Sequence, residues 1–219
     1  MMNEKKISAV LFDFDGVVMD TESQYSRFWD EQGAKYLNIT DFGMLLKGFT
    51  LSETFNKYFK NNNDLQQQIS DELKIFEKDL NYEYIPGFLK FAIELKEMNI
   101  MTGLITSSGL QKMEKVFLLY PDLRSLFDII ITAEDFSHSK PDPECFLLGI
   151  NQLNVKPHDT FIFEDSIHGL EAALNSKALV VGLTTTNSYA QIFEKAHYII
   201  NDFNDVTFGK LIEWRSYKD

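Results

Sequence analysis

The sequence has little of several features that define common classes of protein. Its 219 residues include a single cysteine, Cys145, so the chain can form neither an intramolecular disulfide nor a zinc site built on cysteine thiolates. No apolar run approaches the roughly 18 residues of a membrane span, and the apolar segment 7–12 is too short for the core of a signal sequence. We therefore expect a protein of the reducing cytoplasm that does not cross a membrane.

Basic residues are also scarce. The chain has 21 lysines and arginines against 33 aspartates and glutamates, which gives a formal net charge of −12. Proteins bind nucleic acids and anionic lipids largely through lysine and arginine, so we expect neither as a partner. The chain also has no Gly-x-Ser-x-Gly, no P-loop and no His-Glu-x-x-His, and it therefore gives no support to an esterase, an NTPase or a zinc protease.

The composition and the apolar pattern predict a folded α/β protein. Hydrophobic residues make up 44% of the chain, which is typical of a globular domain. Six apolar segments are continuous rather than alternating, as expected for parallel strands covered on both faces; they span residues 7–12, 100–105, 127–132, 160–163, 178–182 and 197–200. Helical patterns lie between them, over residues 87–98, 110–119, 144–153 and 166–175. We predict a doubly wound, mostly parallel sheet with helices on both faces.

The stretch after the first predicted strand has a different pattern. From Thr21 to about Tyr84 no strand is predicted, and helices are expected over residues 22–35, 52–60 and 65–80, with a polar turn at 61–64. Pro86-Gly87 marks the return to the α/β pattern. We therefore predict a small helical domain, residues 19–85, inserted into an α/β core made of residues 1–18 and 86–219, and we expect a monomer.

Polar residues gather at the carboxyl ends of four predicted strands, where ligands bind in open α/β sheets. Each group has an ordinary explanation by itself, as a turn, a helix cap or a solvated lysine. The groups are Asp13 and Asp15 after the first strand, Thr106-Ser107-Ser108 before a helix, Lys140 in a proline-rich turn, and Glu164-Asp165. Together they place four carboxylates, an anion site of hydroxyls and helix amides, and one lysine at one edge of the sheet.

This combination is typical of a phosphoryl-transfer site. Two like charges 4 Å apart repel by about 4 kcal/mol at an effective dielectric of 20, so the clustered carboxylates call for a hard cation with oxygen ligands, most simply Mg²⁺. One aspartate can attack phosphorus and form an aspartyl phosphate, and the other can act as acid and base. Thr106, the Ser107 amide and Lys140 can hold the phosphoryl oxygens.

Taken in order, the four segments resemble the signature motifs of the haloacid dehalogenase-like (HAD) superfamily, in the branch of small phosphatases and β-phosphoglucomutases. The resemblance covers essentially the whole chain and rests on Asp13-Phe14-Asp15-Gly16-Val17, Ile105-Thr106-Ser107-Ser108, Lys140-Pro141-Asp142-Pro143 and Glu164-Asp165-Ser166 continued by Gly169-Leu170-Glu171-Ala172-Ala173. It implies a Rossmann-like core, a Mg²⁺-dependent phosphatase and a small phosphorylated molecule as substrate. It also implies that the helical insert is a mobile cap, joined through residues 19–21 and 85–87.

The resemblance further implies roles for single residues. Asp13 would be the nucleophile and a metal ligand, and Asp15 the acid and base, with its backbone carbonyl on Mg²⁺. Asp165 would be a direct metal ligand, and Glu164 would act directly or through water. The transferring phosphoryl group would be bound by residues of the first three motifs, namely Gly16, Thr106, Ser107, Ser108 and Lys140.

Two other activities and one non-catalytic function are alternatives to the hydrolysis of a phosphate ester. A dehalogenase needs neither an acid/base aspartate nor Mg²⁺, so Asp15 argues against it. The chain resembles a sugar-phosphate mutase at Asp20-Thr21 and Leu46-Lys47-Gly48. It departs from the mutase pattern at three places: Leu51 stands where a cap arginine is expected, Gly109-Leu110 where lysine and asparagine are expected, and Tyr25 where a histidine is expected. A non-catalytic binding protein is disfavoured because all four motifs are intact.

In the insert, the candidate substrate contacts are Lys47, Lys57, Lys74 and Lys78, with solvated helix lysines as the simpler explanation.

Overall fold

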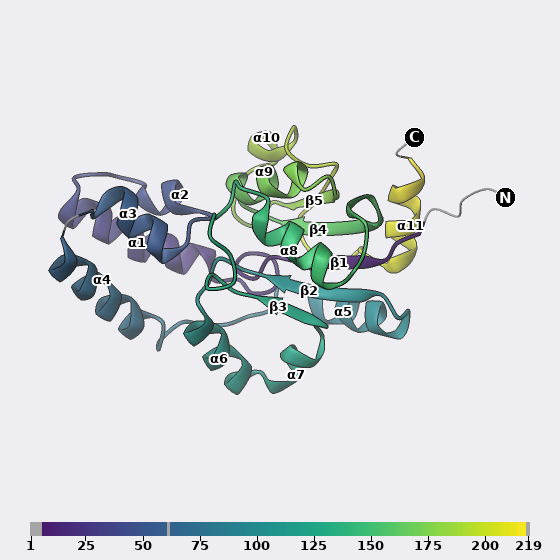
Figure 1. The fold of residues 1–219 in the computed structure, drawn as a ribbon, viewed down its shortest axis with the longest axis horizontal. Coiled ribbons are helices and arrows are strands. Elements are labelled where there is room, and N and C mark those ends of the chain that lie inside the picture. Colours follow the sequence, from purple (N-terminus) through teal and green to yellow (C-terminus); the bar gives the residue numbers. More distant parts are fainter. Residues whose placement is uncertain (1–5, 61, 218–219) are drawn as a thin grey trace.

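The protein is built on one parallel sheet (Figure 1). The computed structural model describes residues 6–60 and 62–217, and within them six parallel strands form a sheet in the order β3-β2-β1-β4-β5-β6. The strands are β1 (Ala9–Phe12), β2 (Met101–Ile105), β3 (Ile129–Ile131), β4 (Thr160–Glu164), β5 (Leu179–Leu183) and β6 (Tyr198–Ile200). Each overlaps a predicted apolar segment, and the predicted α/β fold class is confirmed.

Helices cover both faces of this sheet, and the cores of the two faces are built from alternate residues of the strands. Val10 and Phe12 of β1 belong to one hydrophobic cluster, whereas Ala9 and Leu11 belong to the other. The first cluster contains side chains of α5 (Phe88–Glu97), α6 (Leu110–Leu119), α7 (Pro121–Ser125) and α11 (Phe208–Ser216). The second contains side chains of α8 (Glu144–Gln152), α9 (Ile167–Asn175) and α10 (Tyr189–Ile192), and the short helix η1 (Pro157–Asp159) leads into β4.

Aromatic packing fixes the central strand. The ring of Phe12, the last residue of β1, has its centroid 5.2–6.3 Å from those of five other rings, which belong to Phe88, Phe91, Phe127, Phe163 and Phe203. Such contacts hold the ring from several directions at once. The next residue, Asp13, continues the pairing with β4, because its amide donates to the Phe163 carbonyl at 3.0 Å. The backbone at the carboxyl end of β1 is therefore rigidly placed.

The insert between β1 and α5 is helical, and it lies to the left of the sheet in Figure 1. Its helices are α1 (Glu22–Tyr36), α2 (Phe42–Leu46), α3 (Leu51–Tyr58) and α4 (Asn63–Phe76). They share a hydrophobic cluster of their own, which includes Phe28, Phe42 and Ile69. The helix α2 was not predicted, and α4 begins two residues earlier than predicted because Asn62 caps it by accepting from the Leu65 amide at 3.2 Å.

Two adjacent segments join the insert to the core. The Asp20 amide donates to the Glu83 carbonyl at 2.8 Å, and the Ile85 amide donates to the Val18 carbonyl at 3.0 Å. The chain thus leaves the core and returns to it at one place, close to the end of β1. In the part of the chain that the structure describes, no helix is both long and apolar enough to cross a membrane.

Candidate active site

The predicted site residues converge where the carboxyl ends of the strands face the insert. A cavity of about 670 Å³ lies there, between the core and the insert. Its walls include eight of the predicted residues and a larger number from the insert. The eight are Asp13, Asp15, Thr106, Ser107, Ser108, Lys140, Glu164 and Asp165. Gly16 lies beside Asp165, where a Cβ atom would fall 2.1 Å from Asp165 Oδ2, so this glycine leaves space for that carboxylate.

Lys140 forms the centre of the site. Its ammonium nitrogen lies 2.5 Å from Asp13 Oδ1 and 2.8 Å from Glu164 Oε1, and the lysine is only 2% exposed. Burial alone would lower the pKa of Lys140, but the two carboxylates outweigh it and hold the pKa above its ordinary value. The lysine is therefore charged, and it neutralises part of the negative charge of the two acids.

Three carboxylates form a group that fits a metal ion. Oxygens of Asp13, Glu164 and Asp165 all lie within 4.8 Å of one another. The Oδ2 atom of Asp165 is buried and has no hydrogen-bond partner among the described residues, although a buried oxygen normally has one. Carboxylate oxygens are the ligands that Mg²⁺ prefers. The donor set and the unpartnered oxygen therefore fit a hard divalent cation.

The same group raises the pKa values of its members. Burial, followed by the repulsion of Glu164 and Asp15, raises the pKa of Asp13 to about 8 against the opposing effect of Lys140. Burial and the neighbouring carboxylates, Glu164 first, hold the pKa of Asp165 well above its usual range. Nearby Glu22 has its pKa raised to about 7, chiefly by burial and then by Asp15. A bound cation would reverse these shifts by favouring the ionised forms.

Asp15 has different surroundings, although it stands only two residues from Asp13. Both of its carboxylate oxygens lie 2.7 Å from Lys112 Nζ, and it also accepts hydrogen bonds from the hydroxyls of Ser108, at 2.7 Å, and Thr21. Burial alone would raise the pKa of Asp15, but Lys112 and the hydroxyls lower it below the ordinary value. The two aspartates therefore differ sharply in their tendency to hold a proton.

Sequence reasoning missed Lys112. The lysine is 6% exposed and lies on the buried face of α6, next to Met113 and one turn after Ser108. Its ammonium group also lies 4.2 Å from the ring centroid of Tyr25, in the insert. A lysine within the apolar stripe of a helix, four residues from a predicted phosphate-binding serine, is the signal in the sequence that identifies it.

The remaining predicted phosphate ligands lie at the end of β2. Thr106 is buried, and its hydroxyl accepts from the Ser108 amide at 3.0 Å. The Ser107 hydroxyl donates to the Gly48 carbonyl of the insert at 3.1 Å. At the start of α6 the Leu110 amide is already bound by Glu134 Oε2 at 2.9 Å. An anion at this place would thus meet the Ser107 and Ser108 segment rather than the Leu110 amide.

A loop of the insert docks against the core beside Lys140. The Thr50 amide donates to Ser139 Oγ at 3.2 Å, and the Ser139 amide donates to Glu53 Oε1 at 2.8 Å. Close by, His168 Nδ1 lies 2.7 Å from the Lys47 carbonyl, to which it donates. The insert therefore contacts the core beside the carboxylates, and residues next to the predicted motifs hold it there.

The comparison with known proteins identifies the family. A sequence profile described as haloacid dehalogenase-like hydrolase matches residues 10–183, and the chain belongs to this family. It is 31% identical to the putative phosphatase YhcW of Bacillus subtilis over 94% of this chain and 97% of that protein. It is 28% identical to the β-phosphoglucomutase of the same bacterium over 97% of each chain.

Solved structures agree on the fold. A HAD hydrolase of family IA, variant 3, from Entamoeba histolytica superimposes with a TM-score of 0.80 and 23% sequence identity, covering 95% of this chain and 99% of that one. The predicted superfamily and the predicted enzyme class, a HAD-like phosphatase, are confirmed.

The raised pKa values predict that, without metal, the folded state loses stability between pH 5 and pH 8. Asp13, Glu22 and Asp165 keep protons in the folded state that the unfolded chain releases near pH 4, so raising the pH favours unfolding. Each pKa unit of difference corresponds to about 1.4 kcal/mol. The stabilisation from the low pKa of Asp15 is lost only below about pH 4, outside this window.

Urea unfolding in EDTA at pH 5, 6.5 and 8 measures this effect. Protonation of the exposed His138, which pairs with Glu144, also stabilises the folded state in this range. The deciding comparison is therefore with Asp165→Asn, because that variant keeps His138. We expect the variant to lose clearly less stability over the window than the unmodified chain. Equal pH slopes for the two proteins would contradict the assignment of the raised pKa values.

Proposed function

We propose that the protein is a Mg²⁺-dependent phosphatase that hydrolyses a small phosphorylated metabolite, such as a sugar phosphate, through an aspartyl-phosphate intermediate. The observation that supports this most directly is the contrast between Asp13 and Asp15. Asp13 lies between Lys140 and the carboxylates of the metal-binding group, whereas Asp15 is held apart from them by Lys112 and Ser108. Two titratable groups in opposite environments are typical of a nucleophile paired with an acid and base.

In the first half of the proposed reaction, a carboxylate oxygen of Asp13 attacks phosphorus, an O–P bond forms, and the bond to the leaving oxygen breaks. Asp15 gives its proton to that oxygen, and the free alcohol departs. Lys140, Thr106 and the backbone at Ser107 and Ser108 bind the phosphoryl oxygens. When bound by Asp13, Glu164, Asp165 and the Asp15 carbonyl, Mg²⁺ supplies the positive charge that lets a carboxylate approach a phosphate dianion.

In the second half, ionised Asp15 removes a proton from water, the water attacks phosphorus, and the bond to Asp13 breaks with release of inorganic phosphate. The ion pair with Lys112 favours the ionised form of Asp15 that this step requires. The first half requires the protonated form, so the carboxyl group and Lys112 must separate during the cycle. The position of Lys112 against Tyr25 of the insert couples that separation to movement of the insert. We accordingly propose that residues 19–85 act as a cap over the core of residues 1–18 and 86–219, in a monomeric protein of the cytoplasm.

Hydrolysis requires Asp13, and this can be tested by Asp13→Asn. The amide is nearly isosteric and cannot form an aspartyl phosphate, so turnover of p-nitrophenyl phosphate should fall at least a hundredfold while the far-UV circular dichroism stays unchanged. The matched control is Asp20→Asn, which removes an exposed carboxylate close by in the sequence and should keep most of the activity. Retention of more than a tenth of the activity by Asp13→Asn would refute the nucleophile assignment.

Divalent metal should be required for turnover and should stabilise the fold. EDTA should abolish activity, Mg²⁺ should restore it, and metal at 100 times its dissociation constant should add about 2.7 kcal/mol to the free energy of unfolding. The stabilisation should disappear in Asp165→Asn and persist in Asp79→Asn, which changes an exposed residue of the insert. Full activity in EDTA, with an unchanged melting midpoint, would exclude the metal site.

A sugar-phosphate mutase is the alternative, because the β-phosphoglucomutase of Bacillus subtilis matches along the whole chain. A mutase must grip a second phosphate, yet Leu51 and Gly109 line the cavity at the places where arginine and lysine are expected. We therefore expect β-glucose 1-phosphate, supplied with a trace of glucose 1,6-bisphosphate, to yield glucose and inorganic phosphate if it is accepted. Phosphorus NMR that shows glucose 6-phosphate accumulating well ahead of inorganic phosphate would establish the mutase instead.

A further inference from the structure

The cavity extends beyond the reaction centre into the insert, where the leaving group of a substrate would lie. Half-buried Tyr25 and Trp29 supply aromatic surface there, and Leu46 and Leu73 supply aliphatic surface. Glu22 and Glu77 supply carboxylates, and Glu77 Oε1 accepts from the Tyr25 hydroxyl at 2.8 Å. This part of the wall combines flat apolar surface with hydrogen-bond acceptors.

The lysines that line the cavity are already paired with carboxylates. Four lysines and no arginine or histidine are found among its lining residues, within residues 6–60 and 62–217. Lys140 binds Asp13 and Glu164, and Lys112 binds Asp15. Lys74 is more than half exposed and pairs with Asp71 at 3.2 Å on the surface of α4.

The fourth, Lys47, is the lysine placed to meet a leaving group. Its side chain is 11% exposed and lies 3.7 Å from Glu22 Oε2. Its backbone is fixed to the core, because His168 binds the Lys47 carbonyl and the Ser107 hydroxyl binds the Gly48 carbonyl. The Glu22 carboxylate is therefore the counter-charge of Lys47, the insert lysine whose nearly buried side chain lines the cavity.

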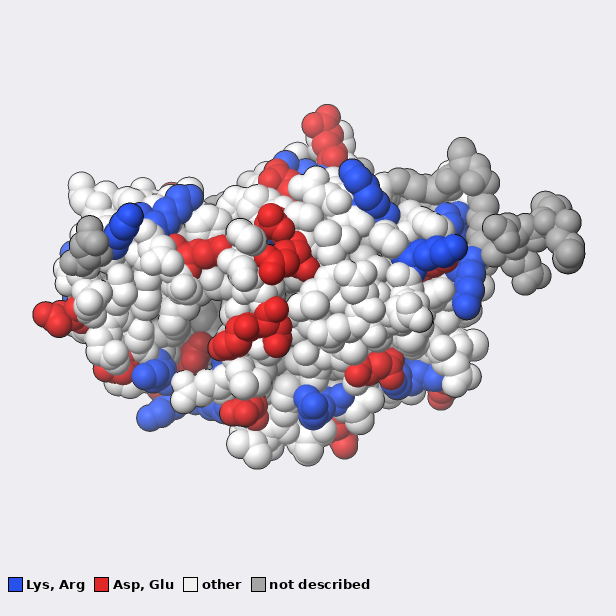
Figure 2. Space-filling model, in the orientation of Figure 1, with Lys and Arg blue, Asp and Glu red and all other residues white. Residues whose placement is uncertain are grey.

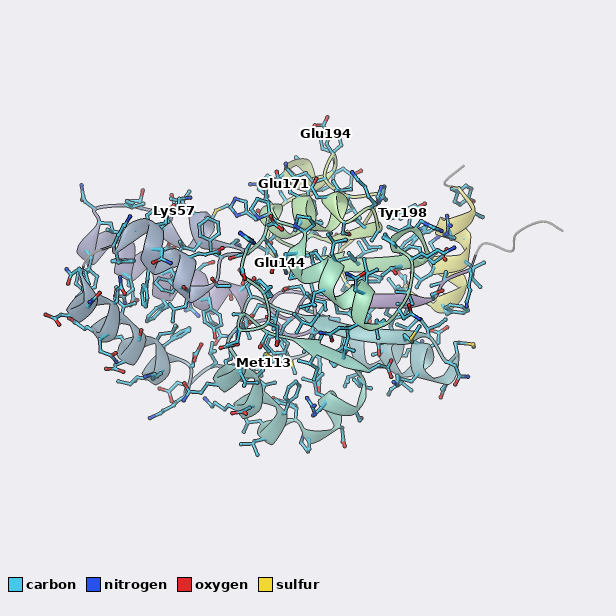
Figure 3. The ribbon with its side chains drawn as sticks, in the orientation of Figure 1. Lys57, Met113, Glu144, Glu171, Glu194 and Tyr198 are labelled. Atoms are coloured by element: carbon cyan, nitrogen blue, oxygen red, sulfur yellow. The ribbon has the colours of Figure 1, made fainter. Side chains whose placement is uncertain are left out.

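The other lysines that sequence analysis associated with the insert lie elsewhere or belong to other contacts. Lys57, labelled on the insert in Figure 3, lies 4.7 Å from the ring centroid of Phe49 and 5.3 Å from that of Tyr58, and it lines a smaller, adjoining cavity. On the outer surface, acidic side chains predominate where the insert meets the core, in the middle of the face shown in Figure 2. Lys57 is not found among the described residues that line the main cavity.

We propose that the Glu22–Lys47 pair makes the enzyme selective for phosphate monoesters whose leaving group carries no second anionic group. A second phosphate or a carboxylate would meet Glu22 and Glu77 without a free cation, and an anion without a counter-charge is strongly disfavoured when it is removed from water. A neutral, hydroxyl-rich leaving group can donate to the same carboxylates and pack against Tyr25 and Trp29. This inference rests on the proposed phosphatase function, and it adds to that function a preference for substrates with an uncharged leaving group.

Two substrates that differ only in charge test the proposal. Sorbitol 6-phosphate and 6-phosphogluconate have the same chain and the same phosphate, but one ends in a hydroxymethyl group and the other in a carboxylate. At pH 8, kcat/KM should be at least tenfold higher for sorbitol 6-phosphate, because Glu22 and Glu77 line the part of the cavity that would receive the carboxylate. Equal values, or a preference for 6-phosphogluconate, would overturn the proposal.

The variant Glu22→Gln assigns the selectivity to the pair. It keeps the size of the side chain and frees Lys47 to bind the carboxylate, so the preference for sorbitol 6-phosphate should shrink at least fivefold. The double variant Glu22→Gln/Lys47→Met should lose this gain. Glu72→Gln, which frees the exposed lysine Lys35 of the insert outside the cavity, is the matched control and should leave the ratio unchanged. An unchanged ratio in Glu22→Gln would show that the pair is not the determinant.

A binding measurement separates this proposal from the proposed function. Calorimetric titration of Asp13→Asn in Mg²⁺ with each sugar phosphate needs no turnover and should show the same order of affinity. If p-nitrophenyl phosphate is not hydrolysed, the phosphatase assignment fails, while the two dissociation constants still decide the charge selectivity. If p-nitrophenyl phosphate is hydrolysed and neither sugar phosphate binds or reacts, only the proposed selectivity for hydroxyl-rich monoesters fails.

Discussion

The ion pairs of one buried lysine hold the site together. Lys140 Nζ lies between Asp13 and Glu164, and all three side chains are buried. Two carboxylates in this position without a cation would be strongly unfavourable, since a buried charge needs a partner. The order of the strands creates this arrangement. Because β1 and β4 are neighbours, their carboxyl ends place Asp13 and Glu164 close together. The segment between β3 and α8 then places Lys140 between the two acids. The group of carboxylates that fits a metal ion depends on the same arrangement, because Asp13 and Glu164 belong to both.

The second constraint is the separation of two aspartates that are almost adjacent in the sequence. Asp13 lies within the carboxylate group and has a raised pKa, whereas Asp15 lies against Lys112 and has a lowered one. The difference arises from their neighbours, because Glu164 faces Asp13 while Lys112 and two hydroxyls face Asp15. In the turn that follows Asp15, Gly16 has a φ of +80°. This left-handed conformation favours glycine, and the missing Cβ also leaves room for Asp165. One residue thus allows the turn and leaves space for the buried carboxylate of Asp165.

Much of this could be predicted from the sequence, because the relevant signals are local. Continuous apolar runs located the strands, and polar residues directly after them located the edge at which Asp13, Thr106 and Glu164 meet. The short helix α2 was missed because it has five residues and begins after Asp41 in a left-handed conformation, without a side-chain cap. Lys112 was missed because its partner is 97 residues away in the sequence, and only the packing of α6 against β1 and the insert brings the two together. The pairing of Lys47 with Glu22 could not be predicted either, because no sequence motif contains both residues.

The joint between the insert and the core has a consequence for how such an enzyme can change. Its two segments are tied to each other by backbone hydrogen bonds at Asp20 and Ile85, so the ends of the insert stay together whatever lies between them. The pairings of β1 with β2 and with β4 involve residues outside the insert. Sequence and length can therefore vary between the two segments without a change of register in the sheet. The insert is free to diverge, while the sheet that positions Asp13, Lys140 and Glu164 is preserved.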